Sequence, residues 1–122
     1  MVAERDAENV VRRFFRFVRS GRIDDLVQLF AHNAVVREPL SSSGVLSDRQ
    51  DIESFLKVAL VHNSEMLSRL EIEKAAGSRV SAAVVFENGG RTKGVFTFDL
   101  DSETKKIARL EMAFGSTDPA RA

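Results

Sequence analysis

The chain has 122 residues, enough for one domain with a sizeable core and too few for two. Basic and acidic residues number 18 each, so the charge balance gives no electrostatic reason to expect nucleic acid or an anionic membrane surface as a partner. The absence of cysteine excludes disulfides, thiol catalysis and thiolate metal sites, and no apolar run reaches the roughly 18 residues that span a membrane.

Apolar residues in the first half of the chain recur at the spacing of three helices. The N-terminus is charged and has no apolar secretory core, so we expect a cytoplasmic protein. The first, over about residues 3–19, has one apolar arc and one arginine arc that we interpret as a solvated face. The second begins after Gly21 and places Ile23, Leu26, Val27 and Phe30 on one side. The third is expected to open with Ser47, because Gln50 three residues on gives capping-box spacing, and to end near residue 63.

Strand patterns occupy the rest of the chain. A turn over residues 31–33 leads into a short apolar strand, Ala34–Val36, which Pro39 ends. Four long stretches of alternating apolar and polar residues follow between residues 68 and 114. The dipeptide Asn88-Gly89 predicts a hairpin between the second and third of them. These patterns predict antiparallel strands joined by short turns.

The expected fold class is therefore α+β, with a cone-shaped, curved antiparallel sheet covered by three N-terminal helices. We expect one domain over residues 1–115 and a polar tail over 116–122. A cone lined by phenylalanine and aliphatic side chains is a natural pocket for a small apolar molecule. The side chains expected to line it are Phe14, Val18, Phe30, Val36, Phe55, Ala59, Val84, Phe86, Phe96, Phe98, Leu110, Met112 and Phe114.

Several of these features together resemble a known family. They are the glycine-led second helix ending in Leu29-Phe30, the strand from Ala34 to Pro39, and the closing Phe114-Gly115. This arrangement resembles the nuclear transport factor 2-like superfamily, which includes polyketide cyclases and scytalone dehydratase, and is most similar to ketosteroid isomerase. The resemblance covers the chain from about Val10 to Gly115 and implies a homodimer formed through the outer sheet face.

The resemblance assigns a role to Glu38, which stands where the isomerase has the aspartate that acts as general base. The alternative is a rim carboxylate that pairs with a nearby arginine or caps backbone amides. The isomerase's oxyanion tyrosine corresponds to Phe14, which has no hydroxyl. Its strand acid corresponds to Phe96 if the apolar alternation faces inward, which turns Asp99 outward. Because one lost oxyanion donor costs about two to three orders of magnitude in rate, ketosteroid isomerase chemistry is not expected.

His62 is the second candidate for acid–base chemistry, as histidines are in the dehydratase branch of the superfamily. Its alternative role is that of a helix-end histidine bonded to a carbonyl, which we favour. The other histidine, His32, lies in the predicted turn and is expected to be exposed. Their separation matches no zinc motif, and no phosphate-binding loop, dinucleotide fingerprint or nucleophile elbow is present, so no metal or cofactor is expected.

Two functions follow from these observations. In the first, the protein binds a small apolar molecule and acts as a lyase or isomerase with Glu38 as proton carrier. In the second, it is a non-catalytic binding or dimeric interaction module whose cavity is partly filled. In both, the outer sheet face is expected to form the homodimer; its charged residues are Arg69, Glu71, Glu73, Arg109 and Glu111.

Overall fold

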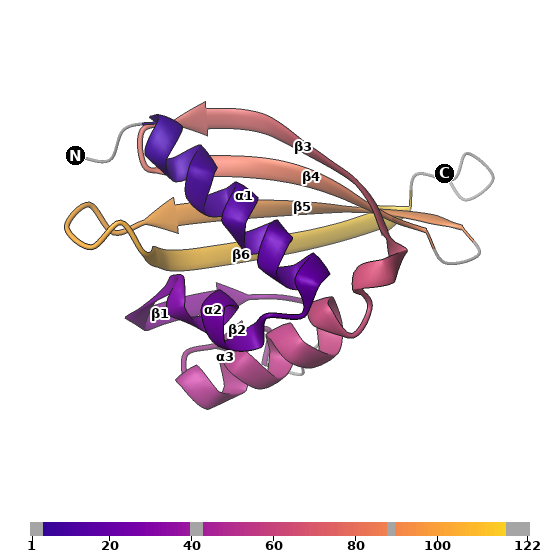
Figure 1. The fold of residues 1–122 in the computed structure, drawn as a ribbon, viewed down its shortest axis with the longest axis horizontal. Helices are drawn as coiled ribbons and strands as arrows, with labels where there is room; N and C mark the ends of the chain where they lie inside the picture. Colours follow the sequence, from indigo (N-terminus) through magenta and orange to yellow (C-terminus); the bar gives the residue numbers. More distant parts are fainter. Residues whose placement is uncertain (1–3, 40–42, 88–89, 117–122) are drawn as a thin grey trace.

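A computed structural model describes residues 4–39, 43–87 and 90–116 of the chain. Its three helices belong to the first half of the chain, and four consecutive strands make up most of the second half (Figure 1). The helices are α1 (Glu4–Ser20), α2 (Ile23–Gln28) and α3 (Arg49–Phe55), and the strands are β1 (Phe30–Arg37), β2 (Val45–Leu46), β3 (Leu67–Ala76), β4 (Arg79–Glu87), β5 (Arg91–Leu100) and β6 (Ile107–Ser116). The predicted α+β class is confirmed. The predicted hairpin dipeptide Asn88-Gly89 and residues 117–122 of the predicted tail lie outside the described residues.

Helix α1 forms because its apolar residues recur at helical spacing and bury one face against the sheet. Val11 and Phe14 are fully buried on that face, whereas Arg12, Arg13 and Arg16 are exposed on the other. The helix ends at Ser20, and Gly21 follows with a φ of +70°, a left-handed conformation that suits glycine. The predicted boundaries of this helix, about residues 3 and 19, each differ from the observed ones by one residue.

Strand β1 starts earlier than the sequence indicates. Residues 31–33, predicted as a turn, belong to the strand, which begins at Phe30, one residue after the C-cap of α2 at Leu29. The reason is a parallel pairing with β6: Phe30 lies opposite Ile107, and the Ile107 amide donates to the Leu29 carbonyl at 2.8 Å. The ladder is irregular between Phe30 and Val35, so only its two ends are in regular register. A partner so far along the chain supplies hydrogen bonds that the local sequence does not reveal.

The third helix also departs from the prediction. Its N-cap is Asp48, not Ser47, because the Asp48 carboxylate accepts from the Gln50 amide at 2.8 Å and from the Asp51 amide at 3.4 Å. The α-helix then changes at Leu56–Val61 into a π-helical segment. Within it the His62 amide donates to the Lys57 carbonyl, five residues back, at 2.9 Å. A single 3-10 turn, Ser64–Met66, leads into β3.

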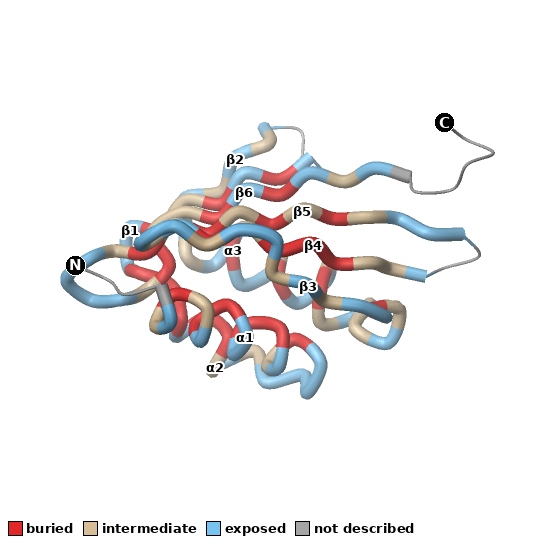
Figure 2. Tube along the Cα trace, turned by 90° about the horizontal axis from the view of Figure 1, so that it is seen from above, coloured by how far each residue is buried: buried red, intermediate tan, exposed pale blue. Residues whose placement is uncertain are grey.

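The sheet has six strands in the order β2-β1-β6-β5-β4-β3. The pairs β3–β4, β4–β5 and β5–β6 are antiparallel, as predicted, and only the β1–β6 pair in the described sheet is parallel. The helices lie on one side of the sheet, where the buried positions of its strands also face (Figure 2). The outer face of β4, β5 and β6 has no described helix over it.

Apolar alternation decides which side chains enter the core. Phe96 and Phe98 on β5 are fully buried, and their cross-strand neighbours Ala82, Val80 and Leu110 are buried with them. Asp99, between two buried residues, points to the outer face and pairs there with a β4 arginine. The predicted orientation of β5, with Phe96 inward and Asp99 outward, is confirmed.

Candidate functional site

A pocket of about 580 Å³ lies where the π-helical segment meets the ends of β4, β5 and β6. This volume falls within the range of small-molecule sites. Its walls are mainly apolar, with Asn63 and Thr92 as the polar groups. The lining residues are Pro39, Ala59, Leu60, Asn63, Met66, Phe86, Thr92 and Phe114.

The helical wall of the pocket depends on Asn63. Its Nδ2 donates to the carbonyls of Ala59 at 3.1 Å and Val58 at 3.3 Å. These bonds satisfy carbonyls at the end of the π-helical segment, where regular helix bonding stops. Both amide hydrogens are thereby used, and no described residue donates to Oδ1. Oδ1 is therefore the Asn63 side-chain atom left to accept a further hydrogen bond.

The sheet wall is built by two phenylalanine rings. Phe86 and Phe114 lie with centroids 6.2 Å apart, and Phe114 meets the buried Phe96 edge-on at 5.9 Å. Gly94 makes this approach possible, because a Cβ there would lie 2.9 Å from Phe96 Cε1 and 3.0 Å from Phe114 Cε1. The glycine thus sets the position of the Phe114 ring that faces the pocket.

Behind this wall the phenylalanine rings of the core pack against one another. Phe14 lies at the centre of a ring cluster, 5.1 Å from Phe98, 6.1 Å from Phe30 and 6.4 Å from Phe96. Phe14, Phe96 and Phe98 are 0% exposed, so no solvent reaches this cluster. The pocket therefore does not include this buried cluster, and we refer to the two regions as the open end and the inner end of the cone.

The residues predicted to line the pocket divide between these two regions. Ala59, Phe86 and Phe114 line the pocket itself. Phe55 is partly buried against the core without lining the pocket. The others are buried in the core: Phe14, Val18, Phe30, Val36, Val84, Phe96, Phe98, Leu110 and Met112. The sequence did not predict five further lining residues, which are Pro39, Leu60, Asn63, Met66 and Thr92. The position of Asn63 depends on a π-helical segment, for which the sequence has no recognisable signal.

Glu38 is the one buried charged side chain in the described part of the chain, at 3% exposure. Its backbone amide donates to the Gly44 carbonyl at 3.0 Å, which holds the end of β1 against the following loop. The next residue, Pro39, lines the pocket, whereas Glu38 itself does not. A buried carboxyl group needs polar partners to offset its lost hydration.

Both histidines are exposed, whereas Glu38 is buried. His62 caps the π-helical segment, is exposed and does not line the pocket; its neighbour Asn63 does. His32 is exposed on β1. Across the described ranges, no group of three or more histidine, aspartate or glutamate side chains could hold a metal ion. Nor does any described helix have the length and apolar character to cross a membrane.

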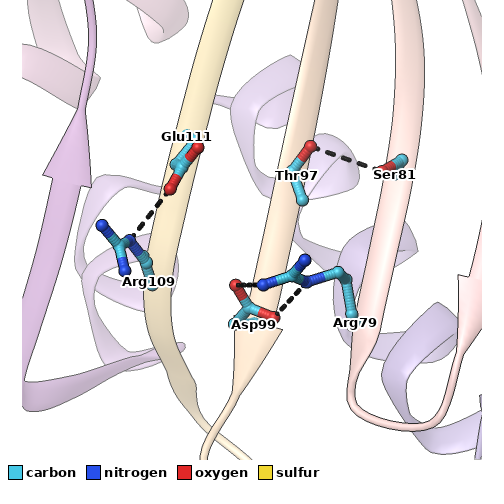
Figure 3. A network of polar contacts seen from close by, with 6 residues as sticks. All are labelled: Arg79, Ser81, Thr97, Asp99, Arg109 and Glu111. Atoms are coloured by element: carbon cyan, nitrogen blue, oxygen red, sulfur yellow. Dashed lines mark hydrogen bonds and ion pairs between the residues drawn. The ribbon is translucent and has the colours of Figure 1, made fainter.

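The outer sheet face carries an ordered set of polar contacts across β4, β5 and β6 (Figure 3). Arg79 pairs with Asp99, the hydroxyls of Ser81 and Thr97 lie 3.3 Å apart, and Arg109 Nε lies 3.0 Å from Glu111 Oε1. The hydrogen bond and the negative charge of Asp99 raise the pKa of Arg79. Beside these contacts, Ala83, Val95 and Ala113 stand opposite one another in register. The face therefore has a strip of small apolar residues next to internally paired charges.

Comparison with known proteins bears on the fold. No protein-family model matches the sequence, and a search of curated proteins finds no match. Among solved structures, the epoxide hydrolase/cyclase-like enzyme SalBIII, described in connection with pyran ring formation in the polyether salinomycin, is 25% identical and covers 97% of both chains with a TM-score of 0.72.

Two further structures are similar at lower identity. A protein from Sphaerobacter thermophilus is 17% identical, covers 87% of this chain and 93% of its own, and has a TM-score of 0.72. A candidate ketosteroid isomerase from Kribbella flavida is 15% identical, covers 93% of this chain and 81% of its own, and has a TM-score of 0.69. With its curved, unclosed six-stranded sheet and three helices, the chain has the nuclear transport factor 2-like fold of the ketosteroid isomerase-like and cyclase-like proteins.

Proposed function

We propose that this protein binds a small apolar molecule in the pocket at the open end of the cone and acts on it as a lyase or isomerase. The observation that supports the proposal is that Glu38, the one buried charged residue in the described part of the chain, directly precedes Pro39, which lines the pocket. In the proposed reaction the Glu38 carboxylate takes a proton from one atom of the bound substrate and returns it to another. Phe86 and Phe114 supply the apolar contact surface.

The likeness to SalBIII supports a cyclising isomerisation as the reaction type. Opening of an epoxide by a hydroxyl of the same molecule removes a proton from the hydroxyl and delivers one to the epoxide oxygen. Atoms balance without a cofactor, and one carboxyl group with one orienting acceptor suffices for the proton transfers. Asn63 Oδ1 provides such an acceptor.

Ketosteroid isomerisation is not part of the proposal. That reaction needs hydrogen-bond donors to the dienolate oxygen, and the corresponding positions, Phe14 and Phe96, are buried apolar rings. The loss of one donor costs about two to three orders of magnitude, so the loss of both removes most of the catalysis.

A second candidate function is a non-catalytic binding module of the same fold. The Phe14 cluster favours it, because it fills the inner cone where a bound substrate would be fully enclosed. Under this alternative the pocket holds a ligand at the surface and Glu38 only stabilises the end of β1.

Turnover separates the two functions. The experiment assays β,γ-unsaturated ketones, hydroxy-ketone dehydrations and hydroxy-epoxide cyclisations with wild type, Glu38→Gln and the control Glu53→Gln, which changes an exposed acid on α3. We expect Glu38→Gln to lower turnover by about a hundredfold or more and the control to leave it unchanged. Equal turnover in both variants would remove Glu38 from the mechanism. Ligand binding without turnover on any substrate would support the binding module.

We also propose that a second copy of the chain packs on the outer sheet face. The strip formed by Ala83, Val95 and Ala113 allows close approach, and the neighbouring charges are already paired within the chain. Sedimentation velocity of wild type, Ala113→Arg and the control Val58→Arg tests this, because Val58 is exposed on the π-helical segment. A wild-type dimer that only Ala113→Arg dissociates is expected. A monomeric wild type contradicts the proposal.

A further inference from the structure

A second hollow lies between α1, α2 and the turn that joins β5 to β6, and it shares no lining residue with the pocket beside Pro39. Its volume is about 460 Å³, within the range of small-molecule sites. Val10 and Leu29, both buried, and the half-buried Phe17 supply its apolar part. We call this hollow the α1–α2 groove.

Basic side chains dominate the charge of the α1–α2 groove. Its two acids already have partners: Asp6 lies 3.5 Å from Lys105 Nζ, and Asp25 pairs with Arg22. Arg13 and Lys106 also line the groove, and neither has a carboxylate partner among the described residues. Two positive charges therefore remain unpaired beside an apolar surface.

The positive charge continues along α1. An adjoining hollow shares Asn9 and Arg13 with the α1–α2 groove and is completed by Arg12 and Arg16, neither of which has a described carboxylate partner. All three arginines are exposed and form no ion pair with a carboxylate among the described residues, so they raise the potential at the groove. The overall balance of 18 basic and 18 acidic residues hides this local excess.

The turn at the rim is held in place by its own bonds. Asp101 accepts from the Glu103 amide at 3.1 Å and from the Thr104 hydroxyl at 3.1 Å. The Asp101 amide donates to the Lys106 carbonyl at 2.8 Å, and the Lys105 amide donates to the Asp101 carbonyl at the same distance. The backbone that carries Lys106 is thus held by hydrogen bonds within the turn, and the Lys105–Asp6 pair joins this turn to α1, which reduces the ordering cost of binding there.

We propose that the α1–α2 groove binds a small organic anion that joins a phosphate or carboxylate group to an apolar or aromatic one. Arg13 and Lys106 contact the anion, and Val10, Phe17 and Leu29 contact the apolar part. A guanidinium group binds a phosphate or carboxylate through two parallel hydrogen bonds, and an ammonium group adds a point charge. This site is separate from the proposed proton-transfer site at Glu38, and neither proposal depends on the other.

Three matched probes test the proposal on the full chain: phenyl phosphate, inorganic phosphate and phenol, titrated into ¹⁵N-labelled protein by NMR. Phenyl phosphate is expected to shift amides of Arg13, Leu29 and Lys106 and to bind at least about tenfold more tightly than either fragment, because only it uses both parts of the groove. Equal affinity for inorganic phosphate, or shifts confined to the pocket beside Pro39, would overturn the proposal.

Variants then assign the contacts. Arg13→Gln with Lys106→Gln is expected to weaken phenyl phosphate binding about tenfold or more, and Arg13→Lys to weaken it less. The control is Arg69→Gln with Arg91→Gln, which removes two exposed basic residues from β3 and the start of β5. Binding that falls equally in the control would overturn the assignment. Sedimentation with phosphatidic acid vesicles distinguishes the source of the anion. If the anion is a lipid headgroup, the protein should sediment with the vesicles, and phenyl phosphate should release it. If the anion is a free ligand, the protein should not sediment with the vesicles.

Discussion

Arg79 on β4 holds Asp99 on β5 through two contacts, Nε to Oδ1 at 2.8 Å and Nη2 to Oδ2 at 3.2 Å (Figure 3). The two residues stand directly opposite each other in register, on the outer face of the sheet. The pair therefore keeps the Asp99 carboxylate out of the cone. Glu38 is the one buried charged residue in the described part of the chain.

Asp99→Asn is expected to leave ligand binding and turnover unchanged and to lower the melting temperature only slightly, because exposed ion pairs contribute little. Arg79→Gln should behave the same way. Since Asp99 raises the pKa of Arg79, the pair's stabilisation is fully present below the ordinary arginine pKa and is lost only as pH rises through the raised value. The difference in melting temperature between wild type and Arg79→Gln should therefore not vary around neutral pH. A large loss of turnover in Asp99→Asn would place its carboxylate in the site.

Alternation predicted the orientation of β5, because a register shift of one residue would expose Phe96 and Phe98 to water. The same reasoning could not find the pairing of β1 with β6, since Phe30 meets Ile107 only through tertiary folding. Nor could it find the clamp at the start of β1, where the Arg49 guanidinium donates to the carbonyls of Val27 at 3.2 Å and Phe30 at 3.4 Å.

The pocket was harder to predict than the fold. Helical spacing treats residues 49–63 as one α-helix, whereas packing converts Leu56–Val61 to π-helical bonding and brings Asn63 to the pocket. The phenylalanine content indicates an apolar interior, but it does not indicate which rings line a pocket and which pack in the core. The ring contacts of Phe14 place it in the buried core, and that depends on side-chain packing rather than on periodicity.

Removal of the observed N-cap of α3, Asp48, should destabilise the protein, whereas removal of the predicted N-cap, Ser47, should not. Asp48→Ala deletes the carboxylate that accepts from two amides at the start of α3, and we expect the free energy of unfolding to fall by about 1 kcal/mol. Ser47→Ala is the matched control and should change it by less than about 0.5 kcal/mol. Chemical denaturation measures both values. A larger loss in Ser47→Ala would mean that the cap lies at Ser47 in solution.

Gly94→Ala should alter the pocket from behind its wall. The added Cβ would meet Phe96 Cε1 at 2.9 Å and Phe114 Cδ1 at 3.2 Å, so at least one ring must move. We expect a loss of about 1–3 kcal/mol in stability and weaker ligand binding, because Phe114 lines the pocket. Gly115→Ala on β6 is the control, since a Cβ there meets nothing within 4 Å. Unchanged ligand affinity in a folded Gly94→Ala protein would exclude Phe114 from the binding surface.

Phe14→Tyr tests whether the inner cone is core or binding site. Phe14 is 0% exposed and surrounded by the rings of Phe15, Phe30 and Phe98, so a hydroxyl there finds no hydrogen-bond partner among them. Its burial should lower the free energy of unfolding by about 1–3 kcal/mol, measured by chemical denaturation.

Phe14→Leu is the control for the effect of the ring itself, because it loses aromatic contacts without adding a polar group. We expect neither variant to gain isomerisation of a β,γ-unsaturated ketone, since the pocket ends at Phe114 and does not reach Phe14. An increase in that activity in Phe14→Tyr, at unchanged stability, would show that substrate enters the inner cone. Such a result would make the hydroxyl an oxyanion donor and would bring the chain closer to ketosteroid isomerase than its present residues do.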